Sequence, residues 1–224
     1  MKIVDKDLEL IDSWHKNAAP WIVAIEEQQI ESRKLVTERA IIDAVVSQNG
    51  RKVLDLGCGE GWLSRQLTAL GMDVLGTDII PALINRARRN GSQRFELLSY
   101  EEIAGGKLAE KFDVVVANFS LLGQESVTGL FRSIHSLLNL QGTFIIQTLH
   151  PLIVCGNFTY VDRWRSTSWD GFSSDFTPTP WYFRTMATWV QLYTTNGLSI
   201  VEIREPLHPQ TGKPAAAIFI GKVL

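Results

Sequence analysis

Between residues 49 and 150, short apolar runs alternate with stretches in which apolar positions recur at helical spacing. The apolar runs predict strands at residues 52–56, 72–78, 94–99, 112–118 and 142–150. The helical spacing predicts helices at residues 62–70, 81–90 and 125–138. Strands that alternate with helices in this way are typical of a mostly parallel, doubly wound sheet.

The pattern changes on both sides of this region. Residues 5–31 are predicted to be helical and carry Trp14 and Trp21, which are seven positions apart and therefore share one face of a helix. A second helix is predicted at residues 34–48. Residues 151–183 are rich in Trp, Phe, Ser, Thr, Pro and Asp and show no clear period.

Regular patterning resumes with a predicted helix at about 184–196 and predicted strands at 198–204 and 215–223. The PLHPQTGKP stretch between these strands is typical of a hairpin connection. The whole pattern predicts a three-layer α/β/α sandwich of about seven strands, mostly parallel with an antiparallel last strand. We expect a single domain made of an N-terminal helical segment (1–48), a ligand-binding core (49–150), an aromatic-rich insertion (151–183) and the C-terminal part of the core (184–224).

Composition narrows the classes of function. The chain has 224 residues, 45% hydrophobic and 21% charged, which suits one soluble α/β domain with a small addition. A net charge of -2 disfavours nucleic acid as a partner. Cys58 and Cys155 have no paired spacing, which argues against a disulfide framework or a metal site. No run has the apolar length of a signal peptide or a membrane span, so we expect a cytoplasmic protein.

The most informative motif lies where the first predicted strand ends. Residues 55–61 read Asp-Leu-Gly-Cys-Gly-Glu-Gly and lead into a predicted helix. Glycines allow the backbone to approach a ligand, and ligands of such sheets bind at the carboxyl ends of strands; the alternative is a plain strand-to-helix turn. Asp78 ends the second strand, where a carboxylate can bind ribose hydroxyls. Trp62 occupies the third glycine position of the dinucleotide motif, which argues against a nicotinamide or flavin dinucleotide.

These motifs resemble those of class I S-adenosylmethionine-dependent methyltransferases. VLDLGCGEG followed by LGTDI is similar to the first two motifs of this Rossmann-like class, and FDVVVANFSLL is similar to its motif at the fourth strand. The turn at residues 139–142 resembles the one that leads into the fifth strand of these enzymes. The nearest resemblance is to the small-molecule enzymes related to ubiquinone and menaquinone biosynthesis methyltransferases. It implies S-adenosylmethionine as the cofactor, without a metal ion.

The resemblance implies roles for the glycine loop. Gly57 and Gly59 would bring the backbone close to the methionine half of the cofactor, and Asp55 would lie near its amino group. Cys58 would contact the cofactor from the same loop. A thiol at a helix N-terminus can act as a nucleophile, but these enzymes commonly have cysteine here without using it chemically.

The second and third strands supply further expected contacts. Asp78 would bind the ribose hydroxyls, and Ile79 would pack against adenine. Related enzymes often have an acidic residue after the third strand, near the adenine amino group, and this chain lacks it at that position. Ser99 or Tyr100 would take its place.

The fourth strand and the N-terminal segment complete the expected cofactor site. Asn118 and Phe119 would lie beside the methionine chain and sulfonium, although a core position for Phe119 is the alternative. The N-terminal segment resembles relatives in which W-x-x-x-A-x-x-W and a later S-R form a lid before the core. Trp21 would contact the cofactor, and Arg33 would pair with the methionine carboxylate. The alternative is core tryptophans and a solvated arginine.

The sequence defines the acceptor side less closely. His150 ends the fifth predicted strand and is the candidate base, because histidine can accept a proton near neutral pH; a structural role in the turn is the alternative. The aromatic-rich insertion is expected to enclose an apolar pocket or to form a satellite core. The residues expected to contact the acceptor are Trp14, Trp164, Trp169, Tyr182 and Arg184.

The sequence therefore predicts a methyltransferase for a small aromatic or hydrophobic acceptor, with O- or N-methylation favoured. A non-catalytic regulatory or partner protein with the same fold is the alternative. A nucleic-acid or protein methyltransferase is disfavoured. Base amino methylation usually goes with an Asn/Asp-Pro-Pro-Tyr/Phe stretch, and residues 118–121 read Asn-Phe-Ser-Leu. We expect a monomer or homodimer, with no nucleic-acid partner and no membrane span.

Overall fold

Seven strands form one sheet, in the order β3-β2-β1-β4-β5-β9-β8, in the computed structural model, which describes residues 5–167, 169 and 172–223. Strands β1 to β5 are parallel, and β9 runs antiparallel between β5 and β8. The strands are β1 (Lys52–Leu56), β2 (Asp73–Asp78), β3 (Arg94–Leu97), β4 (Phe112–Asn118), β5 (Leu138–Thr148), β8 (Leu198–Arg204) and β9 (Ala217–Val223). The predicted sheet, with its antiparallel last strand, is confirmed.

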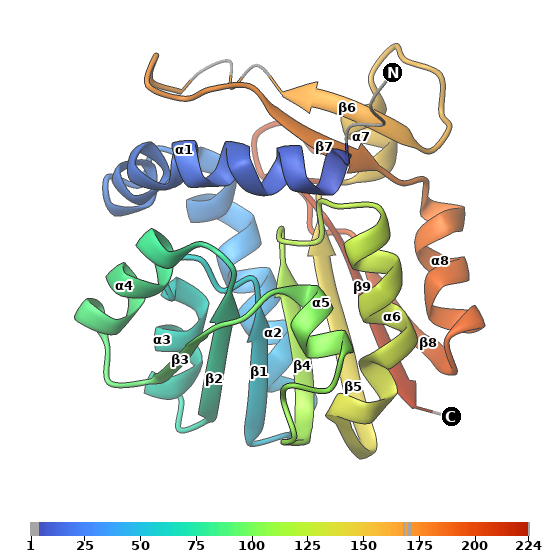
Figure 1. Ribbon diagram of the computed structural model, residues 1–224. Coiled ribbons are helices and arrows are strands. Elements are labelled where there is room, and N and C mark those ends of the chain that lie inside the picture. Colours follow the sequence, from blue (N-terminus) through green and yellow to red (C-terminus); the bar gives the residue numbers. More distant parts are fainter. Residues whose placement is uncertain (1–4, 168, 170–171, 224) are drawn as a thin grey trace.

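Helices cover both faces of the sheet and give the predicted three layers (Figure 1). Helices α2, α3 and α4 pack on one face, and α5, α6 and α8 pack on the other. The helical segments are α1 (Lys6–Glu26), the π-helix η1 (Arg33–Thr37), α2 (Glu38–Val46), α3 (Trp62–Ala69), α4 (Pro81–Asn90), α5 (Tyr100–Ala104), α6 (Glu125–Leu137), α7 (Pro151–Cys155) and α8 (Met186–Thr195). Within the described residues, none of these helices has the length and apolar character that a membrane span requires.

Strand β4 shows how the sequence builds both halves of the core. Val115 and Ala117 pack with α5, α6 and α8, whereas Val114 and Val116 pack with α2 and α3. All four side chains are fully buried, because alternate residues of a strand point to opposite faces of the sheet. A strand that is covered on both faces has a continuous apolar run, which is why the sequence predicts β4 with its observed bounds.

Several parts of the chain differ from the prediction. Strand β5 begins at Leu138, so the turn expected at residues 139–142 lies within this strand, where its pairing with β4 is irregular. The helix expected at residues 34–48 begins as the π-helical turn η1 before α2 continues it. Short helices α5 and α7 follow β3 and β5, where none was expected. The insertion at 151–183 contains β6 (Arg163–Thr167) and β7 (Thr179–Phe183), which pair antiparallel. Adjacent aromatic residues in β7 hide the alternation of apolar and polar positions that marks a strand.

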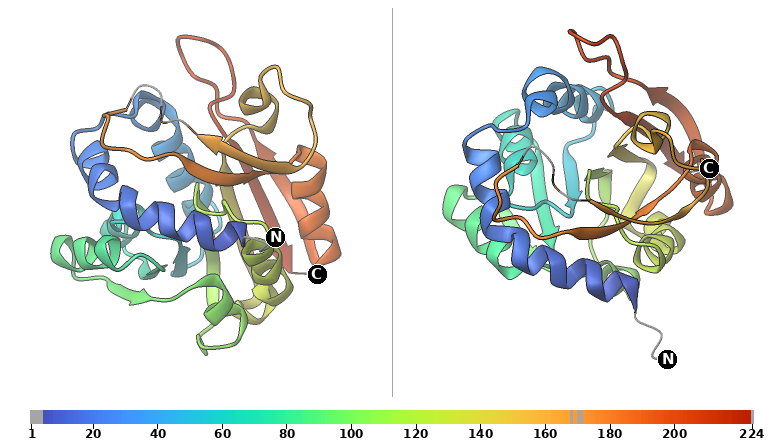
Figure 2. Two further views of the ribbon diagram at one scale, coloured as in Figure 1. Left: turned by 45° about the horizontal axis from the view of Figure 1, so that its top comes forward. Right: turned by 90° about the horizontal axis from the view of Figure 1, so that it is seen from above.

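Helix α1, together with β6 and β7, lies across the carboxyl ends of the parallel strands, and we call these elements the cover (Figures 1 and 2). Asn17, which is fully buried, joins α1 to the segment that enters β7. Its Nδ2 donates to the carbonyl oxygen of Thr177 at 2.9 Å and to Oγ1 of Thr179 at 2.8 Å. Its Oδ1 accepts from the backbone N–H of Thr177 at 2.8 Å. The buried polar side chain of Asn17 therefore links the two parts of the cover by several hydrogen bonds.

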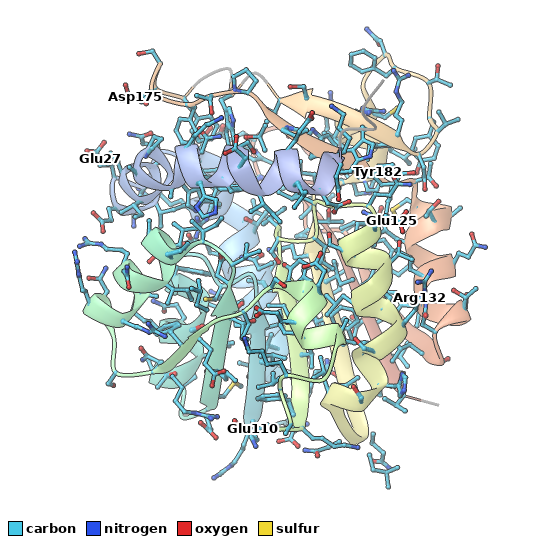
Figure 3. All side chains as sticks on the ribbon, viewed as in Figure 1. Glu27, Glu110, Glu125, Arg132, Asp175 and Tyr182 are labelled. Atoms are coloured by element: carbon cyan, nitrogen blue, oxygen red, sulfur yellow. The ribbon has the colours of Figure 1, made fainter. Side chains whose placement is uncertain are left out.

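Asp7 holds the beginning of α1 to the body of the molecule. Its carboxylate accepts from the backbone N–H groups of Gln124 and Glu125, both at 3.1 Å, and from the hydroxyl of Ser126. These donors begin α6, so Asp7 caps that helix from a different element and complements its positive end. Figure 3 places Glu125 and Tyr182 at this end of the molecule and Glu110 at the opposite end of the strands.

Candidate functional site

A cavity of about 650 Å³ lies between the carboxyl ends of β1, β2 and β4 and the cover. Its volume is within the range of roughly 300–1,000 Å³ that is typical of small-molecule sites. Its walls come from the glycine loop after β1, the end of β2, the β4–α6 loop and β7. Of the residues expected from the sequence, it is lined by Trp14, Trp21, Arg33, Asp55, Gly57, Cys58, Gly59, Asp78, Ile79, Tyr100, Asn118, Phe119, Trp169, Tyr182 and Arg184.

Ser99 and Trp164 do not line this cavity, contrary to expectation. The hydroxyl of Ser99 accepts from the backbone N–H of Glu102 at 3.1 Å, and the Glu102 carboxylate accepts in return from the N–H of Ser99. Ser99 is thus one half of the capping box that begins α5. Trp164 donates from Nε1 to Oε1 of Gln124 at 2.9 Å, and its ring packs against Tyr182. Both side chains are occupied by structural contacts.

His150 also lies outside the residues that line the cavity, although Thr148 and Leu149 line it. The histidine is 4% exposed, and its Nε2 lies 2.6 Å from Oε1 of Glu205. This contact joins the end of β5 to the residue that follows β8. Nε2 of His150 is engaged with Glu205, so these contacts favour the structural role in the turn over the expected base that faces the acceptor.

The glycine loop has a backbone that only glycine adopts without strain. Gly57 has a φ of +67°, and a Cβ there would lie 2.4 Å from Cβ of Ser120 and 2.6 Å from Oη of Tyr100. Gly59 has a φ of +58°, and a Cβ there would meet only Nε1 of Trp21, at 4.0 Å. Gly57 is thus required for packing, whereas Gly59 leaves open space between the loop and the cover.

Asp78 ties the glycine loop to the end of β2. Its Oδ2 accepts from the backbone N–H of Gly59 at 2.9 Å, and its Oδ1 accepts from the N–H of Ile80 at 2.8 Å. Burial raises the pKa of this carboxyl group, and the backbone hydrogen bonds oppose the rise. Each carboxylate oxygen can accept a further hydrogen bond, so Asp78 retains capacity toward a ligand in the cavity.

Asp55 is the most deeply buried carboxylate of the site, with 1% of its surface exposed. The hydroxyl of Ser64 donates to its Oδ2 at 2.7 Å. Burial raises the pKa of Asp55 to about 7, and the nearby charges of Asp78 and Glu60 act in the same direction. Three acidic groups therefore gather at this end of the cavity, and a cation placed among them would be stabilised.

Cys58 and Tyr100 line the cavity without a chemical feature that would make them reactive. Burial raises the pKa of both the thiol and the phenol, which keeps them protonated near neutral pH. The phenol of Tyr100 donates to the carbonyl oxygen of Ser120 at 3.2 Å. The structure thus favours packing over nucleophilic chemistry for Cys58.

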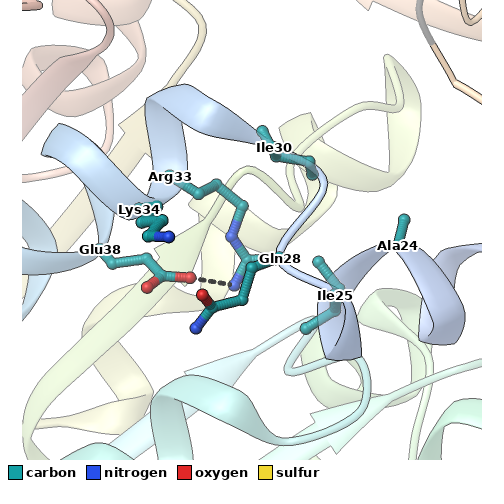
Figure 4. Close-up of a pocket in the computed structure, with 7 residues that line it drawn as sticks. All are labelled: Ala24, Ile25, Gln28, Ile30, Arg33, Lys34 and Glu38. Atoms are coloured by element: carbon teal, nitrogen blue, oxygen red, sulfur yellow. Dashed lines mark ion pairs between the residues drawn. The ribbon is translucent and has the colours of Figure 1, made fainter.

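Arg33 reaches the cavity from the π-helical turn η1, an irregularity that often marks functional positions. Its Nη2 lies 3.0 Å from Oε1 of Glu38, and the guanidinium carbon lies 5.2 Å from the centroid of the Trp62 ring. Figure 4 shows this ion pair in a small second pocket beside Gln28. Arg33 is thus held in place by Glu38 and is not a freely solvated arginine. Burial lowers the pKa of its guanidinium, and the charge of Glu38 opposes this effect.

The end of β4 has a strained backbone. Phe119 has a φ of +55°, which is rare for a bulky residue, and its N–H donates to the carbonyl oxygen of Gln147 at 2.8 Å. The Nε2 of Gln147 donates to Oδ1 of Asn118 at 2.7 Å. Strain of this kind persists where neighbouring contacts enforce it, and it is frequent at ligand sites. The hydrogen bonds that join Gln147 to Asn118 and Phe119 therefore hold the strained end of β4 in place beside the cavity.

Three tryptophans of the cover pack on one another above the cavity. The ring centroids of Trp14 and Trp21 are 5.5 Å apart, and those of Trp14 and Trp169 are 5.9 Å apart. Trp14 and Trp21 belong to the same apolar cluster as Ile79 and Ile80, at the end of β2. Trp14 therefore packs both on the residues that follow β2 and on Trp169 of the insertion.

Arg184 follows β7 and is 3% exposed. Its Nη2 donates to the carbonyl oxygens of Gly123 and Gln124, at 2.7 and 3.1 Å. The guanidinium carbon lies 4.8 Å from the ring centroid of Tyr182 and 5.2 Å from that of Trp189. A buried cation thus forms part of the wall between β7 and the β4–α6 loop.

The cavity also contains residues that the sequence analysis did not select, among them Thr37, Glu60 and Ser120. Glu60 is buried and forms an ion pair with Arg65. The hydroxyl of Ser120 donates to the carbonyl oxygen of Leu56 at 2.6 Å. Glu60 could have been selected, since it stands within the glycine motif. Thr37 has no such local signal, because only the π-helical turn brings it to the cavity.

The comparisons with known proteins identify the family of the chain. A family profile described as "Methyltransferase domain" matches residues 29–203. The chain is 34% identical over 136 residues to a ubiquinone biosynthesis O-methyltransferase from Azorhizobium caulinodans, over 55% of this chain and 53% of that protein. The chain thus spans about half the length of the curated relatives it matches.

Two solved structures share the fold. An S-adenosylmethionine-dependent methyltransferase from Mesorhizobium loti has a TM-score of 0.58 at 21% identity, over 77% of this chain and 90% of that one. Magnesium protoporphyrin IX methyltransferase from Synechocystis PCC 6803 has a TM-score of 0.64 at 17% identity, over 100% of both chains. From the family match, the chain belongs to the methyltransferase domain family. The predicted resemblance to class I S-adenosylmethionine-dependent methyltransferases is confirmed.

Proposed function

We propose that the chain binds S-adenosylmethionine in the cavity and transfers its methyl group to a small acceptor. The observation that carries the proposal is the pair of buried carboxylates, Asp55 and Asp78, beside the glycine loop. Both line the cavity and both have oxygens with remaining hydrogen-bonding capacity. A ligand with a cationic amino group and a ribose would satisfy both groups at once.

The residues at this end of the cavity fit that cofactor. The two oxygens of Asp78 each have room for one ribose hydroxyl in addition to their backbone donors. Asp55 has one oxygen that does not take the Ser64 hydroxyl, and this oxygen would hold the amino group. The open space at Gly59 would admit the methionine chain, with Trp21 on its far side.

The remaining contacts follow from the position of each side chain around the cavity. We propose that Arg33, fixed by Glu38, binds the methionine carboxylate, since a guanidinium has several donors and Glu38 uses only part of them. Ile79 and Trp14 share one apolar cluster, so we place both against adenine. Glu101 lines the cavity beside Tyr100, and we propose that it supplies the acidic group for the adenine amino group.

The β4 end would complete the cofactor site. The Oδ1 of Asn118 is taken by Gln147, so the Nδ2 of Asn118 is the group that we assign to the methionine chain. The strained backbone at Phe119 would set the position of its ring beside the sulfonium.

When bound, S-adenosylmethionine supplies a methyl group on a sulfonium that is already activated for displacement. The task of the chain is to align the acceptor with it and to exclude water. The cover would do both, since α1 and β7 roof the cavity and are joined by Asn17. We call the part of the cavity beside the end of β5, β7 and α8 the acceptor half. It is lined mainly by apolar side chains, including Leu149, Val154, Trp181 and Trp189. We therefore propose an aromatic or hydrophobic acceptor that is methylated on oxygen or nitrogen.

Titration calorimetry with S-adenosylmethionine and S-adenosylhomocysteine tests the cofactor assignment. Asp78→Asn keeps the size of the side chain and one acceptor oxygen, and it should weaken binding by about 1–3 kcal/mol, the scale for a charged hydrogen-bonding partner. Asp73→Asn is the matched control, because Asp73 stands at the other end of β2 and is 61% exposed. It should leave both affinities unchanged.

Binding that Asp78→Asn weakens and Asp73→Asn does not would support the proposal. A screen of phenols and aromatic amines for release of S-adenosylhomocysteine would then identify the acceptor. If neither ligand binds the wild-type chain, the proposed function is wrong. Binding without turnover of any acceptor would favour the non-catalytic alternative.

A further inference from the structure

The acceptor half of the cavity contains a cation whose charge is not neutralised locally. Arg184 takes part in no ion pair with an acidic group among the described residues. Its bonding partners are the neutral carbonyl oxygens of Gly123 and Gln124. Its Nη1 is buried and has no hydrogen-bond partner in the described part of the chain. Burying a charge and a donor without partners costs free energy that a bound ligand would recover.

The nearby carboxylates are occupied elsewhere. Asp7 accepts three hydrogen bonds from the start of α6 and so complements that helix end. The Oδ1 of Asp162 accepts from the backbone N–H of Thr185. Glu125 and the other acidic groups act on Arg184 only at longer range, and burial lowers the pKa of the guanidinium to about 10. Arg184 is therefore cationic at neutral pH.

The surroundings of Arg184 define the shape of a suitable partner. The rings of Tyr182 and Trp189 flank the guanidinium, and Leu149 and Val154 line the same half of the cavity. One cation in an apolar wall matches a ligand with a single negative charge and a flat apolar body. A phosphate, with up to two negative charges, would be poorly balanced by one guanidinium with Asp7 nearby.

Resting on the proposed function, we infer that the methyl acceptor is an aromatic or apolar carboxylic acid and that the unpaired edge of Arg184 binds its carboxylate. A guanidinium binds a carboxylate by charge-assisted hydrogen bonds, which are stronger than those to a neutral amide. Arg184 is then the residue that selects acids over neutral analogues of the same shape.

Paired probes test this inference on the complex with S-adenosylhomocysteine. Benzoate is compared with benzamide, and cinnamate with cinnamamide, by calorimetry or tryptophan fluorescence. In the wild-type complex, each acid should bind at least about tenfold more tightly than its amide. Arg184→Gln should reduce this preference to within about twofold, and Arg184→Lys, which keeps the charge without the fork, should give an intermediate preference. Arg163→Gln, at an exposed arginine opposite Phe183 in β6, is the control and should keep the full preference.

The outcomes separate this inference from the function on which it rests. S-adenosylhomocysteine binding to each variant shows whether the proposed cofactor site is intact. If it binds but the wild-type complex takes acids and amides equally, or takes neither, the inference is wrong and the methyltransferase assignment stands. A preference for acids that survives Arg184→Gln also overturns it. If S-adenosylhomocysteine itself does not bind the wild-type chain, the proposed function fails, and this inference fails with it.

Discussion

Asp55 provides a test in which stability and ligand binding change in opposite directions. Its carboxyl group is buried beside Asp78 and Glu60, and burial raises its pKa from 3.8 to about 7. In the unfolded chain the pKa returns to its ordinary value. Folding therefore favours the protonated form, and the contribution of this group to stability is greatest below about pH 4 and is lost as the pH rises through about 7.

Asp55→Asn keeps the size of the side chain and an acceptor for the Ser64 hydroxyl, but it cannot ionise. A pKa that differs between 3.8 and about 7 corresponds to about 4 kcal/mol at most, at about 1.36 kcal/mol per pKa unit. Relative to wild type, the ligand-free variant should gain about 2–3 kcal/mol of unfolding free energy between about pH 5 and about pH 8. Urea unfolding followed by circular dichroism at the two pH values measures this gain.

The same variant should bind S-adenosylhomocysteine more weakly, because the proposed partner of the amino group has lost its charge. Asp73→Asn is the control for stability, and its exposed carboxylate should contribute less than about 0.5 kcal/mol at either pH. A gain in unfolding free energy for Asp55→Asn that is equal at both pH values, or no gain at all, would refute the interpretation that burial destabilises the ionised carboxylate of Asp55.

Two further predictions concern the glycine loop and the cover of the site. Gly57→Ala should cost at least about 1 kcal/mol more than Gly71→Ala, or about 2–4 °C in Tm. Both glycines have a left-handed φ, but only a Cβ at Gly57 meets other atoms; equal losses in thermal unfolding would contradict this reason. Asn17→Ala should lower the local stability of β7 by about 1–3 kcal/mol. In this variant, amide hydrogen exchange should become faster in β7 and stay unchanged in β4. Asn90→Ala, at an exposed position, is the control and should change neither rate. Unchanged exchange in β7 would contradict the role of Asn17 as a link between α1 and β7.

The sequence predicts those parts of the fold whose signals are local. Helix α4 and strand β4 have the predicted bounds, because each has a clear period or a continuous apolar run. The β6–β7 hairpin was not predicted, because its aromatic residues stand next to one another. The π-helical turn at Arg33 was not predicted either, since its residues continue the helical spacing of α2.

The same difference applies to the site. Gly57, Gly59 and Asp78 were found because they stand in a compact motif at the ends of neighbouring strands. His150 does not line the cavity as expected, because residues at the end of a strand alternate between its two faces and this side chain contacts Glu205, 55 residues further on. The positive φ of Phe119 has no sequence signal, because phenylalanine rarely adopts it.

Two of the residues that hold the cover, Asp7 and Asn17, are polar, whereas Trp14 and Trp21 hold it by apolar contacts with Ile79 and Ile80. Asp7 and Asn17 are both buried, and their partners lie about 117 and 160 residues away in the chain. Each hydrogen bond contributes only about 0.5–1.5 kcal/mol net, because water replaces it when the contact opens. An apolar contact of the same extent would instead expose surface to water without any replacement partner. The two polar anchors therefore fix the position of the cover while adding little to the free energy needed to open it, and most of that free energy comes from the apolar contacts of Trp14 and Trp21.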